Sequence, residues 1–230
     1  MLLYQEIRQY LCSLLNEQPD LKKLPSERIL QDKFGSTRIT IREALSKLEA
    51  EGFIYRQNRK GWFICPPRLK WDPVKKVNFY QLAKEQNFTA STHLVDIATT
   101  VANADLVQQF ALSEPEQTFT ISRIRSLDDR PVMAEEIHCL KSQFEDLESK
   151  PLEGSITTIF EQDYGVEVVR ESSTLYVTAT PEDKAQLLNL SSGSPCLMII
   201  RRRYDKQDKL VDYNIEYWVY GAIEIEVTSN

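Results

Sequence analysis

The sequence predicts an α+β protein with two domains, a small helical domain followed by a larger antiparallel-sheet domain. Residues 24–63 carry the pattern of a helix, a tight turn, a second helix and two short β-prone runs. Residues 65–76 hold three prolines, which a helix interior or a central strand excludes. The remaining chain alternates β-prone segments with short helices. We therefore place the domains at residues 1–65 and 77–230, joined by a linker at residues 66–76.

The first domain is expected to contain three packed helices. Residues 2–17 are amphipathic and form the first. Ser26 is a suitable N-cap for the second, and Gly35 suits the left-handed conformation that ends it. Thr37 caps the third helix, and its apolar residues repeat with helical spacing on one face. These residues are Ile41, Ala44, Leu45 and Leu48.

The third helix has the features of one that enters the DNA major groove. Arg38 and Arg42 are four residues apart, so they share a solvent-facing side near its N-terminus. Arginine forms bidentate pairs with guanine and with phosphate. Two β-prone runs at residues 53–55 and 62–64 flank a basic tip, as in a wing that contacts either the phosphates or the minor groove of DNA. The alternative is an ordinary helical subdomain with a solvated charged face.

This ordered set of residues resembles the GntR family of winged helix-turn-helix repressors. The matching residues are Leu24, Pro25, Ser26, Glu27, Arg28, Ser36, Thr37, Arg38, Thr40, Ile41, Arg42, Glu43, Ala44, Leu48, Glu51, Gly52, Phe53 and Ile54. The resemblance implies that the family's contacts to operator DNA fall on specific side chains. These are Arg28, Thr37, Arg38, Thr40 and Arg42, with Asn58 and Arg59 at the wing tip.

Charge is divided unevenly between the two predicted domains. Residues 1–65 carry 11 Lys and Arg against 8 Asp and Glu, a net +3, whereas residues 66–230 carry 17 against 26, a net −9. The basic end therefore coincides with the DNA-binding motif. The four scattered cysteines predict a cytoplasmic protein with reduced, partly buried thiols and no metal site, and no cofactor is expected. No apolar run approaches 18 residues, which predicts that the protein does not span a membrane.

The second domain is predicted to be an antiparallel sheet with helices between its hairpins. We expect helices at residues 78–86, 105–110 and 155–164, and a fourth that starts at Pro181 as its first residue. Strands are expected at residues 92–101, 118–127, 131–140, 166–178, 196–204, 210–219 and 223–227, the last closing the sheet. Asp128 and Asp129 form a hairpin turn.

The order of these elements resembles the UTRA domain, the effector-binding half of the HutC subfamily of GntR regulators. The residues that carry the resemblance are Arg123, Ile124, Arg125, Asp128, Asp129, Arg130, Pro131, Val132, Glu135, Gly154, Ser155, Tyr164, Gly165, Leu210, Val211 and Asp212. The resemblance implies a chorismate-lyase-like antiparallel sheet with a ligand cleft, and a homodimer.

Arg123 and Arg125 share one face of their strand and would repel each other unless an anion lay between them. This favours a phosphate or carboxylate effector, with Glu135 on the partner strand and the helix start at Ser155 nearby. The resemblance places effector contacts at Arg123, Arg125, Glu135 and Ser155, and also at Thr157, Asn78, Asp212 and Trp218. The alternative is that the arginine pair faces solvent or forms structural salt bridges with Glu135 or Glu136.

Other polar and aromatic residues receive structural interpretations. Residues 201–203 are three arginines, which could form a nucleic-acid contact. Strand alternation sends Arg202 to one face and its two neighbours to the other, so we expect a solvated strand end paired with Glu224 and Glu226. His93 and His138 are expected to have structural roles. Trp71 either couples the two domains or covers apolar surface as a loop residue.

These observations favour a homodimeric transcriptional regulator whose affinity for double-stranded operator DNA changes when a small anionic metabolite binds. Two alternatives are an enzyme of chorismate-lyase-like fold and a DNA-binding dimer without an effector. No activated nucleophile, metal cluster or phosphate-binding loop is evident, which argues against the enzyme.

Overall fold

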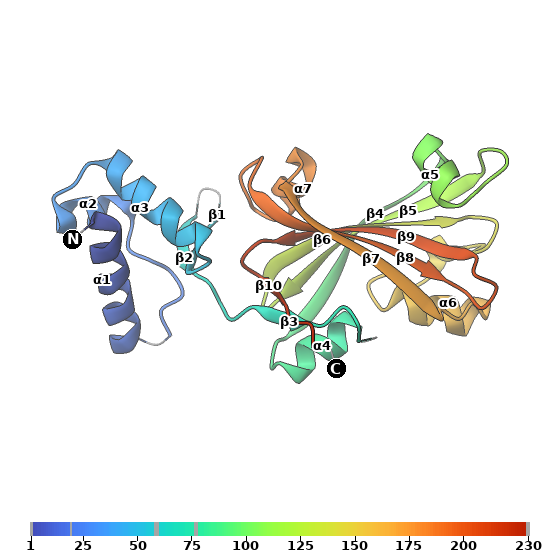
Figure 1. Ribbon diagram of the computed structural model, residues 1–230, viewed down its shortest axis with the longest axis horizontal. Coiled ribbons are helices and arrows are strands. Elements are labelled where there is room, and N and C mark those ends of the chain that lie inside the picture. The colour runs from blue at the N-terminus through green and yellow to red at the C-terminus, as the bar shows by residue number, and fades with distance from the viewer. Residues whose placement is uncertain (1, 19, 58–59, 76–77, 229–230) are drawn as a thin grey trace.

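The computed structural model describes residues 2–18, 20–57, 60–75 and 78–228. It shows two domains arranged along the long axis of the molecule (Figure 1). The N-terminal domain contains α1 (Leu3–Glu17), α2 (Glu27–Phe34), α3 (Arg38–Ala50), β1 (Ile54–Gln57) and β2 (Gly61–Ile64). The two strands pair as an antiparallel hairpin, so the predicted winged arrangement of three helices is confirmed. No helix among the described residues is long and apolar enough to cross a membrane.

The predicted helix caps are present in the N-terminal domain. The Ser26 side chain accepts a hydrogen bond from the Ile29 amide, and α2 ends at Gly35, which has a φ of 57°. The Thr37 side chain accepts from the Thr40 amide at the start of α3. Because these caps satisfy amides that lack intrahelical partners, they fix where each helix begins. The core joins α1, α2, α3 and the wing through Ile7, Leu11, Leu24, Leu30, Ile41, Ala44, Leu45, Leu48, Ile54 and Trp62.

The C-terminal domain is built on a six-stranded antiparallel sheet. Its strands, in the spatial order β4-β5-β6-β9-β8-β7, are β4 (Ala90–Val101), β5 (Gln117–Leu127), β6 (Arg130–Leu140), β9 (Leu210–Val219), β8 (Pro195–Tyr204) and β7 (Arg170–Ala179). The helices are α4 (Phe79–Glu85), α5 (Ala104–Gln109), α6 (Ile156–Tyr164), α7 (Glu182–Leu187) and the short 3-10 turn η1 (Leu147–Ser149). In Figure 1, α4 and α6 lie on one face of the sheet, and α5 and α7 on the other.

Most predicted elements of this domain are confirmed, with small shifts at their ends. Asp128 and Asp129 both have positive φ, at 49° and 62°, which matches a tight hairpin turn. The strand predicted from residue 166 begins only at Arg170. Pro181 is the N-cap of α7 and not its first helical residue.

Two sequence-based expectations about the sheet and the linker are corrected. The segment at residues 223–227 does not close the large sheet, because β10 (Ile223–Ile225) pairs in parallel with β3 (Leu69–Trp71). The strand β3 lies inside the proline-rich segment that we expected to be a linker. Its Leu69 and Trp71 are buried in the core of the C-terminal domain, so Trp71 is a core residue and not a loop residue.

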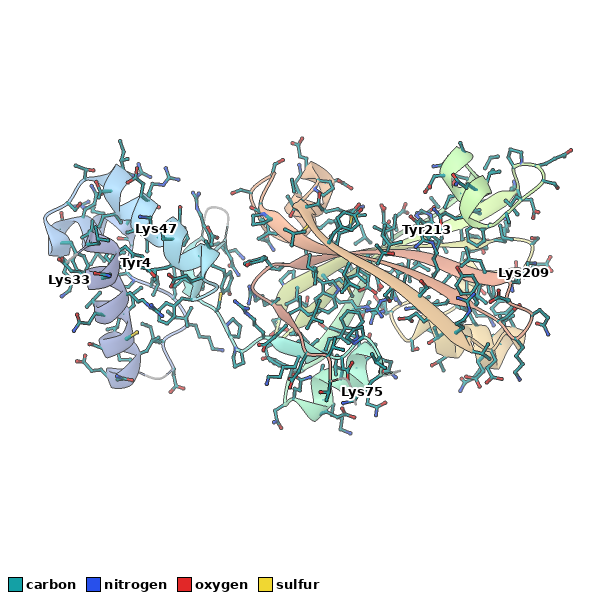
Figure 2. The ribbon with its side chains drawn as sticks, viewed as in Figure 1. Tyr4, Lys33, Lys47, Lys75, Lys209 and Tyr213 are labelled. Carbon is teal, nitrogen blue, oxygen red and sulfur yellow. The ribbon has the colours of Figure 1, made fainter. Side chains whose placement is uncertain are left out.

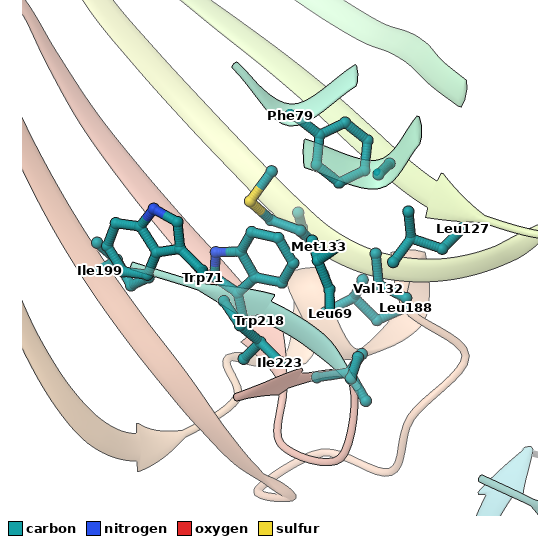
Figure 3. Packing of buried hydrophobic residues seen from close by; sticks show 14 residues of the cluster. Leu69, Trp71, Phe79, Leu127, Val132, Met133, Leu188, Ile199, Trp218 and Ile223 are labelled. Atoms are coloured by element: carbon teal, nitrogen blue, oxygen red, sulfur yellow. The ribbon is translucent and has the colours of Figure 1, made fainter. Parts of the chain in front are cut away.

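Figure 3 shows this core cluster, which combines Trp71, Trp218, Met133 and Phe79 from four different elements. Side chains fill both domains, with Lys33 and Lys47 on the N-terminal domain and Lys75 and Lys209 on the other (Figure 2). The four cysteines are free thiols: Cys12 is exposed, Cys65 is half-buried, and Cys139 and Cys196 are buried.

The two domains meet where the wing approaches the β5–β6 hairpin. The Arg130 guanidinium, at the start of β6, lies 3.8 Å from the centre of the Tyr55 ring on β1. Its Nη2 has no hydrogen-bond partner among the described residues, and the negative ring face of Tyr55 offsets that loss. Gly52 has a φ of +73°, a left-handed conformation that favours glycine at this junction.

Candidate nucleic-acid interface and ligand cavity

The predicted DNA-contacting residues of the described chain lie together on α2 and α3. Arg28, Thr37, Arg38 and Arg42 are exposed, and Thr40 is half-buried. The Arg38 side chain is 68% exposed and the Arg42 side chain 44%. Both side chains are therefore accessible from solvent and are not packed into the body of the domain. Asn58 and Arg59 lie outside the described residues.

A carboxylate that we did not assign lies beneath these arginines. Glu27 Oε2 accepts a hydrogen bond from Arg38 Nε at 3.1 Å, and Glu27 Oε1 lies 3.5 Å from Arg42 Nε. Oε1 also accepts from Trp62 Nε1 on the wing at 3.2 Å. Burial raises the pKa of Glu27, but the hydrogen bonds from Trp62 and Arg38 outweigh it and the pKa is lowered. The carboxylate is therefore ionised at neutral pH.

The second candidate site is a cavity of about 440 Å³ between the sheet, α4 and the start of α6. Its polar lining includes six of the eight predicted effector residues: Asn78, Arg123, Arg125, Ser155, Thr157 and Trp218. The other two, Glu135 and Asp212, are buried and pair with arginines of the lining. The structure thus brings all eight residues together.

Arg123 and Arg125 occupy different environments although both pair with Glu135. Arg123 is 1% exposed, and its Nη1 donates to the Leu152 and Gly154 carbonyls at 2.7 and 2.8 Å. It therefore holds the loop that leads into α6. Arg125 donates to Glu135 through Nε alone, at 2.7 Å. Its two Nη nitrogens have no acceptor in the described part of the chain.

Glu135 is the anion between the two guanidinium groups. It lies within hydrogen-bond distance of both Arg123 and Arg125 and is completely buried. Burial opposes its ionisation, but the charges of Arg123 and Arg125 outweigh burial and lower its pKa to about 2. Of the two alternatives considered for the arginine pair, the salt bridge to Glu135 is present, whereas Glu136 pairs with Lys184.

A second group of arginines lines the opposite wall of the cavity, which sequence reasoning missed. Arg201 pairs with Glu216 and Glu171, at 2.6 and 2.7 Å. Arg203 pairs with Glu171 and Asp212, both at 3.1 Å. The expected solvated strand end with partners Glu224 and Glu226 is therefore wrong. The alternation itself is confirmed, because Arg202 points to the other face and donates to Gln109.

The start of α6 adds hydrogen-bond donors to the cavity. The Ser155 side chain caps the helix by accepting from the Thr158 amide, and its hydroxyl lies 3.1 Å from that of Thr157. A helix N-terminus with free amides and hydroxyl groups favours an anion. On α4, the Asn78 side chain accepts from the Gln81 amide, so it is used as a helix cap at the rim.

The histidines have separate polar partners. His138 Nδ1 lies 3.0 Å from the Thr120 hydroxyl, and His93 Nδ1 lies 4.0 Å from Glu153. Among the described residues no three His, Cys, Asp or Glu side chains gather as metal ligands would.

A winged helix-turn-helix joined to an antiparallel-sheet domain with a polar cavity defines a class of ligand-responsive DNA-binding regulators. Comparison with protein families agrees: the model of bacterial regulatory proteins of the gntR family matches residues 3–64, and the UTRA domain model matches residues 85–223. The chain belongs to the GntR family of bacterial transcriptional regulators and carries a UTRA domain.

Individual relatives support this assignment. The chain is 31% identical over 213 residues to the uncharacterized HTH-type transcriptional regulator YihL of Escherichia coli (strain K12), covering 88% of this chain and 86% of YihL. It is 28% identical over 203 residues to the HTH-type transcriptional repressor NagR of Bacillus subtilis (strain 168), covering 87% and 83%. Regulators of this family bind operator DNA and a small molecule, so the chain is a transcriptional regulator and not the enzyme that the sequence left open.

Solved structures show the same fold over nearly the whole chain. The crystal structure of PhnF from Mycobacterium smegmatis matches with a TM-score of 0.69 at 20% identity, covering 97% of this chain and 98% of PhnF. The structure of YydK from Bacillus subtilis subsp. subtilis str. 168 matches with a TM-score of 0.62 at 20% identity, covering all of both chains.

Proposed function

We propose that this chain is a homodimeric, cytoplasmic repressor of the HutC subfamily that binds a pseudo-palindromic operator and responds to a small anionic metabolite. The observation that carries the DNA-binding half is the exposed pair Arg38 and Arg42 on the first turns of α3. In a dimer, each α3 enters one half-site about one helical turn from the other. Arg28, Thr37 and Thr40 contact the same half-site, and Asn58 and Arg59 contact its flank.

The anionic group of the effector binds at the end of the cavity formed by Arg125, Ser155 and Thr157. Arg125 offers two Nη nitrogens that have no acceptor in the described chain, and the start of α6 offers hydroxyl and amide donors. Arg201 and Arg203 are neutralised by Glu171, Asp212 and Glu216, so the opposite wall suits hydroxyl groups or an amine better than a second anion. The effector class is therefore a small polar metabolite with one phosphate or carboxylate.

The domain boundary of this regulator lies before β3. Residues 66–68 connect the wing to β3, which is built into the core of the UTRA domain. The Arg201 guanidinium also lies over the indole of Trp71 on β3, 4.4 Å from the centre of the Trp71 ring. A ligand that changes the position of Arg201 thus acts close to the segment that enters the DNA-binding domain.

A thermal-shift screen tests the effector half of the proposal. Phosphorylated sugars, phosphonates, amino acids and small carboxylates are each added to the full-length protein. We expect at least one phosphate or carboxylate to raise the melting temperature by several degrees, because a ligand that binds only the folded state stabilises it.

Replacing Arg125 by alanine is expected to abolish that shift, because the unpaired Nη donors are lost. The matched control is Arg170→Ala, which removes an exposed arginine of the same domain that pairs with Asp208. It should leave the shift unchanged. A full shift in the Arg125 variant would place the anion elsewhere, and no shift with any ligand would favour a dimer without an effector.

Signal transfer between the domains passes through the contact of Arg130 with Tyr55. The effector can change operator affinity only by binding more tightly to one arrangement of the domains than to another. Arg130→Ala removes the contact of this guanidinium with the Tyr55 ring, between the β5–β6 hairpin and the wing. We expect this variant to keep its thermal shift with the effector but to lose most of the effector's influence on operator affinity, measured by fluorescence anisotropy. An unchanged influence would rule out this contact as the route.

A further inference from the structure

Glu27 lies at the centre of the proposed DNA-contacting surface although its negative charge repels DNA. Its side chain is 17% exposed, whereas Arg38 and Arg42 above it are 68% and 44% exposed. A carboxylate so close to incoming phosphates weakens binding by simple electrostatics. We therefore expect a benefit to DNA recognition that offsets this repulsion, and the contacts of Glu27 indicate one.

The contacts of Glu27 hold each arginine by its Nε nitrogen. Arg38 Nε is 3.1 Å from Oε2, and Arg42 Nε is 3.5 Å from Oε1. Arginine has five N–H donors, so four of them on each guanidinium remain for other acceptors. A guanidinium held at Nε can still present its two Nη groups end-on to guanine O6 and N7.

Glu27 is itself held in place by two elements, α2 and the wing strand β2. It is the first residue of α2, where the partial positive charge of the helix N-terminus favours a carboxylate. Trp62 Nε1, from the buried indole on β2, donates to Oε1 at 3.2 Å. The carboxylate therefore fixes two arginines of α3 relative to both α2 and the wing.

We propose that Glu27 is a positioning residue that orients Arg38 and Arg42 before they meet DNA and thereby raises the preference for operator over other DNA. This inference rests on the proposed function, because it assumes that the two arginines contact the operator. Two long side chains ordered in advance lose less entropy on binding, in each half of the dimer. Phosphate contacts with non-operator DNA do not need that order, so they gain little from Glu27.

The substitution Glu27→Gln separates positioning from charge. Glutamine keeps the size of the side chain but removes the negative charge that holds both guanidinium groups. Without positioning, the loss of a repelling charge would tighten binding to every DNA sequence. We expect operator affinity to fall about tenfold, while affinity for a random-sequence duplex stays the same or rises slightly. Both are measured by fluorescence anisotropy, with an operator selected from a random library by the wild-type protein.

Two further variants complete the test. Asp32→Asn removes a charge from an exposed position of the same helix and should leave the ratio of operator to random affinity unchanged. Glu27→Asp keeps the charge but is one methylene shorter, so it should lower operator affinity less than glutamine does. In an Arg38→Ala, Arg42→Ala background, Glu27→Gln should no longer change the ratio.

The outcomes distinguish this inference from the proposed function. If the wild-type protein selects no operator, the proposed function fails. If it does and Glu27→Gln binds operator as tightly as wild type or more tightly, Glu27 is not a positioning residue. If Glu27→Gln loses affinity equally for operator and random DNA and also has a lower melting temperature, Glu27 contributes to domain stability alone. That result would also overturn the inference.

Discussion

Replacing Arg38 by alanine is expected to lower operator affinity by about 100-fold. The side chain stands on the first turn of α3, where a recognition helix presents its residues to base edges. A bidentate arginine–guanine pair contributes about 1–3 kcal/mol, and the proposed homodimer makes the contact in both half-sites. The loss is measured by fluorescence anisotropy at fixed salt concentration, because phosphate contacts make all DNA affinities depend on salt.

The matched control for this prediction is Arg8→Ala. Arg8 is an exposed arginine of α1 whose side chain approaches Glu51, away from α3's first turn. The Arg8→Ala substitution removes the same charge from the same domain and should change operator affinity by less than about threefold. Effector-induced stabilisation should survive in both variants. Unchanged operator affinity in the Arg38 variant would show that α3 does not read the operator through this residue.

Replacing Glu135 by glutamine is expected to lower the free energy of unfolding by about 3 kcal/mol at pH 7. The residue is fully buried between Arg123 and Arg125, and its loss leaves two guanidinium groups without their shared counter-charge. Arg123 also holds the loop before α6, so the start of α6 should loosen too. Urea unfolding followed by tryptophan fluorescence reports this change, because Trp71 and Trp218 are both in the core of this domain.

The effect of the Glu135 substitution should depend on pH in a defined direction. The pKa of Glu135 is lowered to about 2 from its ordinary value of 4.5. Its contribution is therefore complete above about pH 5 and is lost as the pH falls from there toward 2. The difference in stability between wild type and variant should shrink over that window. Glu114→Gln, at an exposed loop position, should show no such dependence, and a constant difference between pH 7 and pH 3 would contradict the account.

Local signals were sufficient to predict most of the elements. Ser26, Thr37 and Ser155 all cap the helices that follow them, and Gly35 and Gly165 end helices with positive φ. These residues act through their nearest neighbours, so their meaning can be deduced from short stretches of sequence.

Pairings between distant segments could not be predicted in the same way. The strand β3 pairs with β10, more than 150 residues further along the chain, and no local pattern identifies such a partner. The prolines around Leu69 and Trp71 favoured a linker, whereas burial of these two side chains determines the outcome. Tertiary packing therefore outweighed local propensity.

The arginines of β8 that line the cavity show which sequence pattern was overlooked. Period-two alternation places Arg201 and Arg203 on one face, and the neighbouring strands carry Glu171 and Asp212 directly opposite Arg203. Acidic residues with the same alternation on adjacent segments could have indicated a buried ionic array. Glu27 was harder to assign, because its partners on α3 and β2 become neighbours only in the folded domain.

The most direct test of the central claim is selection of operator sequences from a random duplex library by the wild-type protein and by its Arg38→Ala variant. The wild-type protein should enrich two inverted half-sites about one helical turn apart, each with an invariant guanine. The variant should enrich the same half-sites, but at one base pair in each half-site its sequence preference should be weaker. An identical motif from both proteins, or no motif from the wild type, would contradict the assignment of α3 as the reading helix.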